Sequence, residues 1–426
     1  MAPIPDPARS VVYLHVGSPK SGTTFLQQIL WRNRAELGRA GVLLPARSFQ
    51  GQQRAVWDLR DLEQHPADPA PPWTGLWDRL AQQVLKSPQP TAIVSHETLA
   101  SLDERQIKRA VEAFHPAEVH VVYTMRDLAG LLPSEWQEYV KHRCLLDYEA
   151  WISEVIDGGP EVGVGQWFWR VHDAPEVLRR WSTAVPAERI HLITVPPPGA
   201  PRDLLWRRFA DLVGVSPDEV DLDQAFSNSS LGFVEAELLR RVNAAVDPET
   251  PQWLYSIAVK GAYAHEVLSL RKGRKVYFPS DRRDWVDRRQ LEMIESLRAG
   301  GYDMIGDLDE LVGRAPHGHA KDMATHDELL DAAAGSTLAL LDEIYRLRGE
   351  VAQLRGEIAK DRTKPLYKTV VEHFSETNPT VMKARVAYWH AVERVRGTNG
   401  TSASEAHKPR PSLWSGAKWP KGSGPA

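Results

Sequence analysis

A glycine-rich segment near the start of the chain carries residue types that bind phosphate. Residues 17–24 read Gly-Ser-Pro-Lys-Ser-Gly-Thr-Thr, between an apolar run at 11–17 and helical spacing over 22–37. A phosphate at such a junction meets free backbone N–H groups and the positive end of a helix dipole. The Gly-x4-Gly spacing and the hydroxyls of Thr23 and Thr24 agree. We therefore expect a phosphate-binding loop and not merely a tight turn.

The position of the lysine in this loop limits the chemistry. In an ATP-binding P-loop the lysine directly follows the second glycine and precedes a Ser or Thr that holds magnesium. Here Lys20 lies two residues before Gly22, and Thr23 takes the usual place of the lysine. A cation inside the loop suits the leaving oxygen of a 5′-phosphate. A sulfuryl group carries less charge than a phosphoryl group, so its transfer needs no metal clamp.

With this loop the sequence resembles the P-loop sulfotransferases that use 3′-phosphoadenosine 5′-phosphosulfate (PAPS), in particular their bacterial, actinobacterial-type members. The resemblance covers Val11 to about Val312, with further landmarks at 134–137, 228–232 and 301–308. It implies PAPS as donor and 3′-phosphoadenosine 5′-phosphate (PAP) as product, without a metal. The residues that it places on the 5′-phosphosulfate are Lys20, Ser21, Gly22, Thr23 and Thr24.

Two segments are candidates for the 3′-phosphate. The run 119–126 predicts a strand that ends at Arg126, and Ser134 follows at the start of a predicted helix. A guanidinium and a hydroxyl so placed can bind one phosphate, and the spacing matches the family's 3′-phosphate motif. By itself Arg126 would equally suit a surface ion pair. The triplet Arg271-Lys272-Gly273 is similar to the Arg-Lys-Gly that eukaryotic cytosolic sulfotransferases use on this phosphate, or it belongs to a solvated basic face.

The catalytic base is expected at the end of the strand predicted at 92–95. There Ser95 is followed by His96 and Glu97, and sulfuryl transfer needs a group that accepts the acceptor's proton. Related enzymes use a His or a Glu, and bacterial members often show Ser-x-Glu, so the resemblance favours Glu97 over His96. The alternatives are that His96 orients a loop and Glu97 caps a helix. His15 fits a strand residue satisfied by a hydrogen bond.

Short apolar segments alternate with helical patterns over most of the chain. This alternation predicts an α/β fold with a P-loop-type parallel sheet flanked by helices and a ligand site at the carboxyl ends of the strands. The predicted strands are 11–17, 42–44, 92–95, 119–124 and 190–195.

A seven-residue repeat begins near residue 330 and predicts a coiled coil. Glutamates at g and arginines at e of the next heptad favour a parallel homodimer, although a single helix folded back on the catalytic domain would also bury the stripe. Its a positions are Leu330, Thr337, Ile344, Val351 and Ile358, and its d positions are Ala333, Leu340, Leu347 and Leu354. The predicted organisation is an extension at 1–10, a sulfotransferase domain at 11–312, a linker at 313–329, the coiled coil at 330–362, a helical extension at 363–396 and a disordered tail at 397–426.

Composition excludes several classes of protein. The 426 residues hold 52 basic and 56 acidic side chains, so binding to nucleic acid through bulk charge is not expected. One cysteine, Cys144, can form neither an internal disulfide nor a cysteine metal cluster. No signal-peptide or transmembrane pattern occurs, and we expect a cytoplasmic protein.

The interpretation is a sulfotransferase that moves a sulfuryl group from PAPS to a hydroxyl or amine of a glycan, glycolipid or small metabolite. Two alternatives remain: a P-loop kinase or other phosphoryl transferase, and a non-catalytic coiled-coil scaffold on a retained nucleotide fold. The aromatic run Trp167-Phe168-Trp169 suits either an acceptor cleft or core packing.

Overall fold

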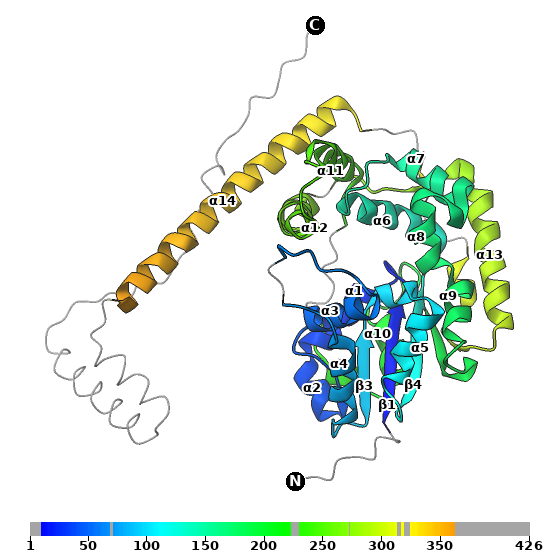
Figure 1. Cartoon of the computed structure of the whole chain (residues 1–426). Coiled ribbons are helices and arrows are strands. Elements are labelled where there is room, and N and C mark those ends of the chain that lie inside the picture. Colours follow the sequence, from blue (N-terminus) through cyan, green and yellow to red (C-terminus); the bar gives the residue numbers. More distant parts are fainter. Residues whose placement is uncertain are drawn as a thin grey trace, which may run out of the picture. The chain divides into compact units, whose positions relative to one another are not determined.

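The computed structural model describes residues 10–68, 71–222, 230–271, 273–312, 317–318 and 324–362 (Figure 1). The chain divides into two units, Met1–Ala333 and Ala334–Ala426. The first unit contains the sheet and its covering helices. The described part of the second unit is the continuation of one long helix, α14, which spans His326–Arg362. The predicted segments at 1–9, 363–396 and 397–426 lie outside the described residues.

Six parallel strands form the central sheet in the order β2-β3-β1-β4-β5-β7. Five of them confirm the predicted strands to within one or two residues. The sixth, β7, is a short addition at one edge beside β5. Their bounds are Val11–Gly17 (β1), Val42–Leu43 (β2), Thr91–Ser95 (β3), Glu118–Met125 (β4), Ile190–Thr194 (β5) and Asp303–Ile305 (β7).

Strand β1 pairs with β3 on one side and with β4 on the other. The chain therefore adds strands first on one side of β1 and then on the other, although all strands are parallel. In open α/β sheets, the crevice at such a change of side lies beyond the carboxyl ends of the strands and receives the ligand. The glycine-rich loop follows β1, and Arg126 follows β4. The topology therefore brings both predicted phosphate-binding segments to the same edge of the sheet.

Helices cover both faces of this sheet, as the predicted fold class requires. On one face α1 and α10 pack against Ile93, Val122 and Ile193. On the other face the larger core collects α3 to α6, α8 and α9 around alternate residues of β1 and β4. The helices of the first unit are Thr23–Arg32 (α1), Arg34–Arg39 (α2), Phe49–Leu59 (α3), Leu76–Leu85 (α4), Glu104–Glu112 (α5), Leu128–Lys141 (α6), Tyr148–Ser153 (α7), Gly163–His172 (α8), Ala174–Trp181 (α9), Leu204–Val213 (α10), Phe233–Ala245 (α11), Gln252–Tyr255 (α12) and Arg283–Ala299 (α13).

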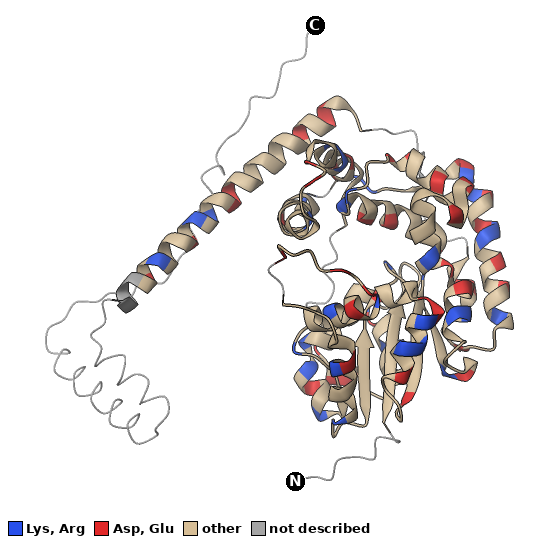
Figure 2. Cartoon of the chain, in the orientation of Figure 1, with Lys and Arg blue, Asp and Glu red and all other residues tan. Residues whose placement is uncertain are grey.

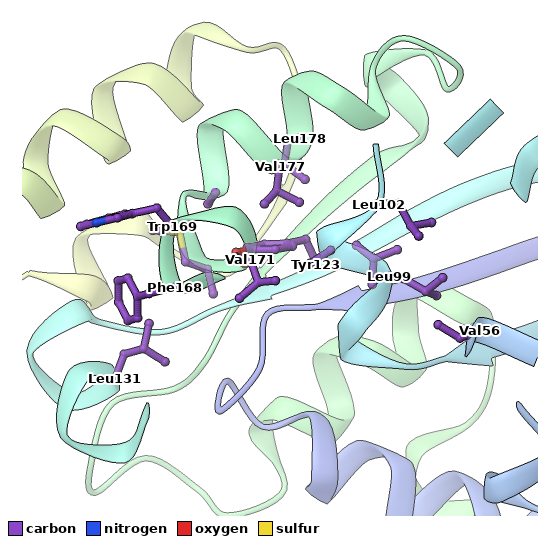
Figure 3. Packing of buried hydrophobic residues seen from close by; sticks show 14 of the residues in the cluster. Val56, Leu99, Leu102, Tyr123, Leu131, Phe168, Trp169, Val171, Val177 and Leu178 are labelled. Carbon is purple, nitrogen blue, oxygen red and sulfur yellow. Dashed lines mark hydrogen bonds between the residues drawn. The ribbon is translucent and has the colours of Figure 1, made fainter. Parts of the chain in front are cut away.

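Burial explains why the strands read as near-continuous apolar runs. Every residue of β5 is buried, and in β1 the last four are. Figure 3 shows the larger core, where Phe168 and Val171 from α8 and Val177 from α9 lie around Tyr123 of β4. Two-sided burial of this kind is typical of parallel sheets.

Two short helical segments and a small sheet complete the elements used below. The 3-10 turn η2, Glu97–Ser101, follows β3 directly, and the π-helical segment η7, Ser256–Val267, continues from α12. Two-residue strands Phe278–Pro279 (β6) and His317–Gly318 (β8) pair with each other. Helix α14 begins at His326, inside the predicted linker, and its Leu329 and Ala332 belong to the larger core.

Candidate functional site

The loop between β1 and α1 is held to the neighbouring strand by hydrogen bonds from both sides. The Ser18 N–H donates to the Thr124 carbonyl at 2.8 Å, and the Thr124 hydroxyl donates to the Gly17 carbonyl at 3.0 Å. Inside the loop, the hydroxyls of Ser18 and Ser21 lie 2.7 Å apart. Gly17 has φ +126°, a conformation that side chains rarely adopt. The loop shape is therefore fixed by this chain's own contacts.

Gly22 forms the N-terminal boundary of α1. It has φ +80°, and a Cβ there would lie 2.3 Å from Leu205 Cδ2 of α10, so only glycine fits. Because glycine has no side chain, it cannot cap the first turn, whose N–H groups stay available to an anion. Thr23 is buried and Thr24 is exposed at this end. The geometry is that of an anion-binding helix terminus.

Lys20 points from the loop to helix α6. Its Nζ lies 3.1 Å from Glu138 Oε2, and the backbone takes a left-handed φ of +57°. Burial works to lower the pKa of the ammonium, but Glu138 and more distant carboxylates outweigh it, so the pKa is raised. Lys20 is thus positively charged at neutral pH, and Glu138 is its ion-pair partner in this structure.

Arg126 and Ser134 come together at Gly130 in the first half of α6. A Cβ on Gly130 would lie 2.8 Å from Arg126 Nη2, and the Ser134 hydroxyl donates to the Gly130 carbonyl at 3.1 Å. Asp127 caps the helix and lies 3.5 Å from Arg126 Nε. The prediction that Ser134 starts the helix is wrong, because α6 begins six residues earlier behind the Asp127 cap. Arg126 precedes the Asp127 cap and Ser134 lies in the second turn of α6, and each has a contact at Gly130.

Glu97 lies beside the loop and the first turns of α1. Gln27 Nε2 donates to Glu97 Oε2 at 2.9 Å, and a Cβ on Gly17 would lie 3.1 Å from the Glu97 carbonyl oxygen. Burial would raise the pKa of the carboxyl, but His96 and the Gln27 hydrogen bond outweigh it, and the pKa is lowered. An ionised carboxylate therefore stands next to the phosphate loop.

His96 is the N-cap of the turn η2. Its Nδ1 accepts from the Thr98 N–H at 3.3 Å and lies 2.8 Å from the Thr98 hydroxyl, while the ring stacks on Phe49. Burial lowers the pKa of the imidazole, against the opposing influence of the Glu97 carboxylate. The predicted alternative, that His96 orients a loop, accounts for these contacts.

The Arg271-Lys272-Gly273 turn makes ion pairs within the first unit. Arg271 Nε lies 3.4 Å from Glu235 Oε1, and its Nη2 lies 3.1 Å from Asp331. Gly273 backs onto Glu235, since a Cβ there would lie 2.0 Å from Oε2. Lys272 lies outside the described residues. These contacts hold the turn to α11 and to the start of α14, so a role on the 3′-phosphate stays a prediction.

Two further arginines that follow this turn in the sequence are also paired. Arg282 lies 3.0 Å from Asp157, and Arg289 lies 2.9 Å from Asp173. Figure 2 shows Lys and Arg interspersed with Asp and Glu over the described helices. Acidic residues that are distant in sequence therefore pair with several of the basic residues between 271 and 289.

The aromatic run at 167–169 belongs mainly to the core. Phe168 and Trp169 are buried in the larger cluster, and Trp169 Nε1 donates to the Val155 carbonyl at 2.9 Å. Trp167 is half-buried and receives a cation–π contact from Arg60. Packing explains these side chains, as one of the two predictions held.

Sequence reasoning missed a charged group next to the loop. Glu138 accepts contacts from Lys20, from Lys141 of its own helix and from Lys260 of η7. The signal was helical periodicity, because Ser134, Glu138 and Lys141 share one face of α6 at i, i+4 and i+7. Lys260 has no such signal, since only the tertiary fold brings η7 to α6.

Comparison with known proteins gives little. No family model matches the chain, and no curated protein matches it. Among solved structures, a sulfotransferase from Alicyclobacillus acidocaldarius is similar with a TM-score of 0.33 and 15% identity, over 55% of this chain and 92% of that one. A likeness at this level carries no argument about function.

Two kinds of feature, a metal-binding cluster and a membrane-spanning helix, are absent from the described residues. Within those ranges, no three His, Cys, Asp or Glu side chains gather in a way that could hold a metal ion. No helix in the same part of the chain is both long and apolar enough to cross a bilayer.

Proposed function

We propose that this chain is a sulfotransferase that transfers a sulfuryl group from PAPS to a hydroxyl or amine of an acceptor. The observation that carries the proposal is the loop between β1 and α1, with its lysine inside the loop and not after the second glycine. Lys20 is positively charged there at neutral pH, and the first turn of α1 has no side-chain cap.

The residues on this edge of the sheet fit such a donor. The α1 N-terminus with Ser21, Thr23 and Thr24 suits the 5′-phosphosulfate, because it offers backbone donors and hydroxyls. Arg126 and Ser134 suit the 3′-phosphate, because both lie at Gly130, beyond the neighbouring strand β4. PAPS supplies an activated sulfur whose bond to the phosphate oxygen breaks as the acceptor bond forms.

Each charged residue then has a task in the transfer. Glu97 accepts the proton of the attacking hydroxyl or amine, since its lowered pKa keeps it ionised at neutral pH. Lys20 and the N–H groups of α1 stabilise the negative charge on the leaving phosphate oxygen. His96 positions Glu97 by holding the turn η2.

Calorimetry with two nucleotides tests the donor assignment. Arg126→Ala and Ser134→Ala are expected to weaken PAP by about tenfold or more, because hydrogen bonds to a charged phosphate are lost. Adenosine 5′-phosphosulfate, which has no 3′-phosphate, should lose less than about twofold.

Gly130→Ala offers a sharper version of this test. The new Cβ meets the Arg126 guanidinium and the Asp127 carboxylate, so PAP should weaken although both phosphate-binding side chains are kept. Gly38→Ala is the matched control, because nothing lies within 4 Å of a Cβ there. Equal losses for the two nucleotides in the Arg126 and Gly130 variants would overturn the assignment.

A further inference from the structure

Three lysines converge on the single carboxylate of Glu138. Glu138 Oε2 lies 3.1 Å from Lys20 Nζ and 3.4 Å from Lys141 Nζ, and Oε1 lies 2.8 Å from Lys260 Nζ. His142 Nε2 is 3.4 Å from Oε1. Burial would raise the pKa of Glu138, but His142 and the three lysines outweigh it and hold the pKa well below its ordinary value. Glu138 is therefore a fixed counter-ion and not a base.

The cluster carries more positive charge than its carboxylate can match. Three ammonium groups contact one carboxylate, while Glu135, itself 3.5 Å from His172, and Glu97 act on Lys20 only from farther away. Lys141 is nearly inaccessible, with 4% of its side chain exposed. A buried cation without a full partner is costly, which favours an anion as the missing partner.

The pKa values of neighbouring groups reflect the same excess of positive charge. Burial and the cations Lys141, Lys260 and Lys20 together lower the pKa of His265 on η7 to about 4, despite the opposing effect of Glu138. Burial likewise lowers the pKa of Lys141, with Lys20 and Lys260 adding to the effect against Glu138.

A ligand can reach the cluster from solvent. The side chains of Lys20, Glu138 and Lys260 keep 29%, 25% and 25% of their surface exposed. Lys141 and His142 lie at the C-terminal end of α6, beyond Ser134, and Lys260 belongs to η7. The phosphate and sulfuryl groups of the donor are already assigned to the loop, to α1 and to Arg126.

We propose that Lys260, Lys141 and His142 form an oxyanion subsite for the acceptor, which would carry a carboxylate, sulfate or phosphate near the group that is sulfated. This inference rests on the proposed function and names its substrate class: acidic acceptors. In the absence of substrate, Glu138 pairs with the cations of the subsite. When the oxyanion binds, these cations contact both the oxyanion and Glu138. Lys20 belongs to both sites and brings the acceptor next to the donor.

Titration of inorganic sulfate into the full-length protein saturated with PAP tests the subsite. PAP fills the phosphate positions, so sulfate is left with the Lys260 subsite and the vacant sulfuryl position of the donor, which the comparison of PAPS with PAP distinguishes. Lys260→Met is expected to weaken sulfate by about tenfold or more while PAP and PAPS affinities stay within about twofold. Lys108→Met, which removes an exposed lysine on α5, should change nothing.

Glu138→Gln gives a prediction of opposite sign. Loss of the internal counter-ion leaves three ammonium groups unmatched, so sulfate should bind several-fold more tightly than to the wild type. A purely structural ion pair would instead give a less stable protein with no gain in sulfate affinity.

The outcomes separate this inference from the proposed function. Equal sulfate affinity in wild type and Lys260→Met overturns the subsite, even where PAP binds well. A Lys260→Met variant that weakens PAPS but not PAP also overturns it, because the lysine would then serve the donor's sulfuryl group. Failure of the wild type to bind PAP at all overturns the proposed function, and with it the assignment of the subsite to an acceptor.

Discussion

Lys20 and Glu97 are the two charged residues that are proposed to act at the loop after β1. Lys20 leaves the loop toward α6, and Glu97 stands at the end of β3, where Gln27 of α1 holds its carboxylate. One residue is a cation suited to a leaving group, and the other is an anion suited to an incoming proton. In the proposed transfer, the first acts on the donor and the second on the acceptor.

Glu97→Gln tests the base at constant shape. The amide cannot take a proton, so turnover should fall by about 100-fold or more while PAP affinity stays within about twofold. Initial rates and calorimetry on the same preparation provide the two readouts. His96→Asn is the companion variant, expected to keep most of the activity because His96 acts through the turn η2. Normal turnover in Glu97→Gln with a dead His96→Asn would reverse the ranking of the two residues.

Residues near the loop differ in how far sequence could identify them. Lys20 and Arg126 were identifiable because each lies in a local pattern, a Gly-x4-Gly loop and a strand end. Glu138 and Lys260 were not, because their meeting depends on the packing of η7 against α6. Arg271 was predicted with an open alternative, and its partners Glu235 and Asp331 come from helices that no short motif links to it.

At the scale of elements, strand β1 supplies both the loop and a buried histidine. His15 is fully buried, with Nδ1 2.7 Å from the Ser95 hydroxyl of β3. Burial lowers its pKa from 6.5 to about 4, against the opposing influence of Glu97. The predicted hydrogen bond of His15 within the sheet is therefore present, and the ring is neutral.

This histidine should make the fold sensitive to acid. Because the unfolded chain takes up a proton near pH 6.5 and the folded chain only near pH 4, the free energy of unfolding falls between these values and levels off below them. The loss is about 3 kcal/mol from this group. Urea denaturation at several pH values should show a shallower decline for His15→Asn than for wild type. Parallel declines in the two proteins would contradict the assignment.

The strands were predictable because two-sided burial leaves short apolar runs between turns. Strand β7 was missed since it has only three residues and begins with the exposed Asp303. The start of α6 was misplaced because Pro133 lies inside the helix, although proline favours a first turn. Asp127, which accepts from the Gly130 N–H, sets the true start and outweighs that signal.

At the scale of the whole molecule, helix α14 presents an apolar stripe at heptad spacing. Ile344, Leu347, Val351, Leu354 and Ile358 are each about half exposed within the chain. Leu330, the first predicted a position, is likewise exposed, whereas Leu329 beside it is buried in the first unit. We propose that a second copy of α14 covers the stripe beyond Leu340, with glutamates at g facing arginines at e of the partner.

Light scattering on the full-length chain tests this assembly. The wild type is expected to be a dimer, and Leu354→Glu should shift it to monomer, because a buried d position becomes charged. Gln353→Glu, at an outward position of the same turn, is the control and should leave the dimer intact. A wild type that is monomeric at tens of micromolar would instead favour a single helix folded back on its own chain.

The central claim is sulfuryl transfer from PAPS without a metal, assisted by Lys20. The most direct measurement is the transfer of labelled sulfate from PAPS, in the presence of EDTA, to a panel of glycans, glycolipids and small hydroxylated or amino metabolites. Labelled product is expected with the wild type. Lys20→Ala should be slower by roughly 30- to 1000-fold, equivalent to about 2–4 kcal/mol of barrier, whereas Lys108→Ala should match the wild type. An undiminished rate in Lys20→Ala, or no labelled product beside magnesium-dependent phosphate transfer from ATP, would contradict the account.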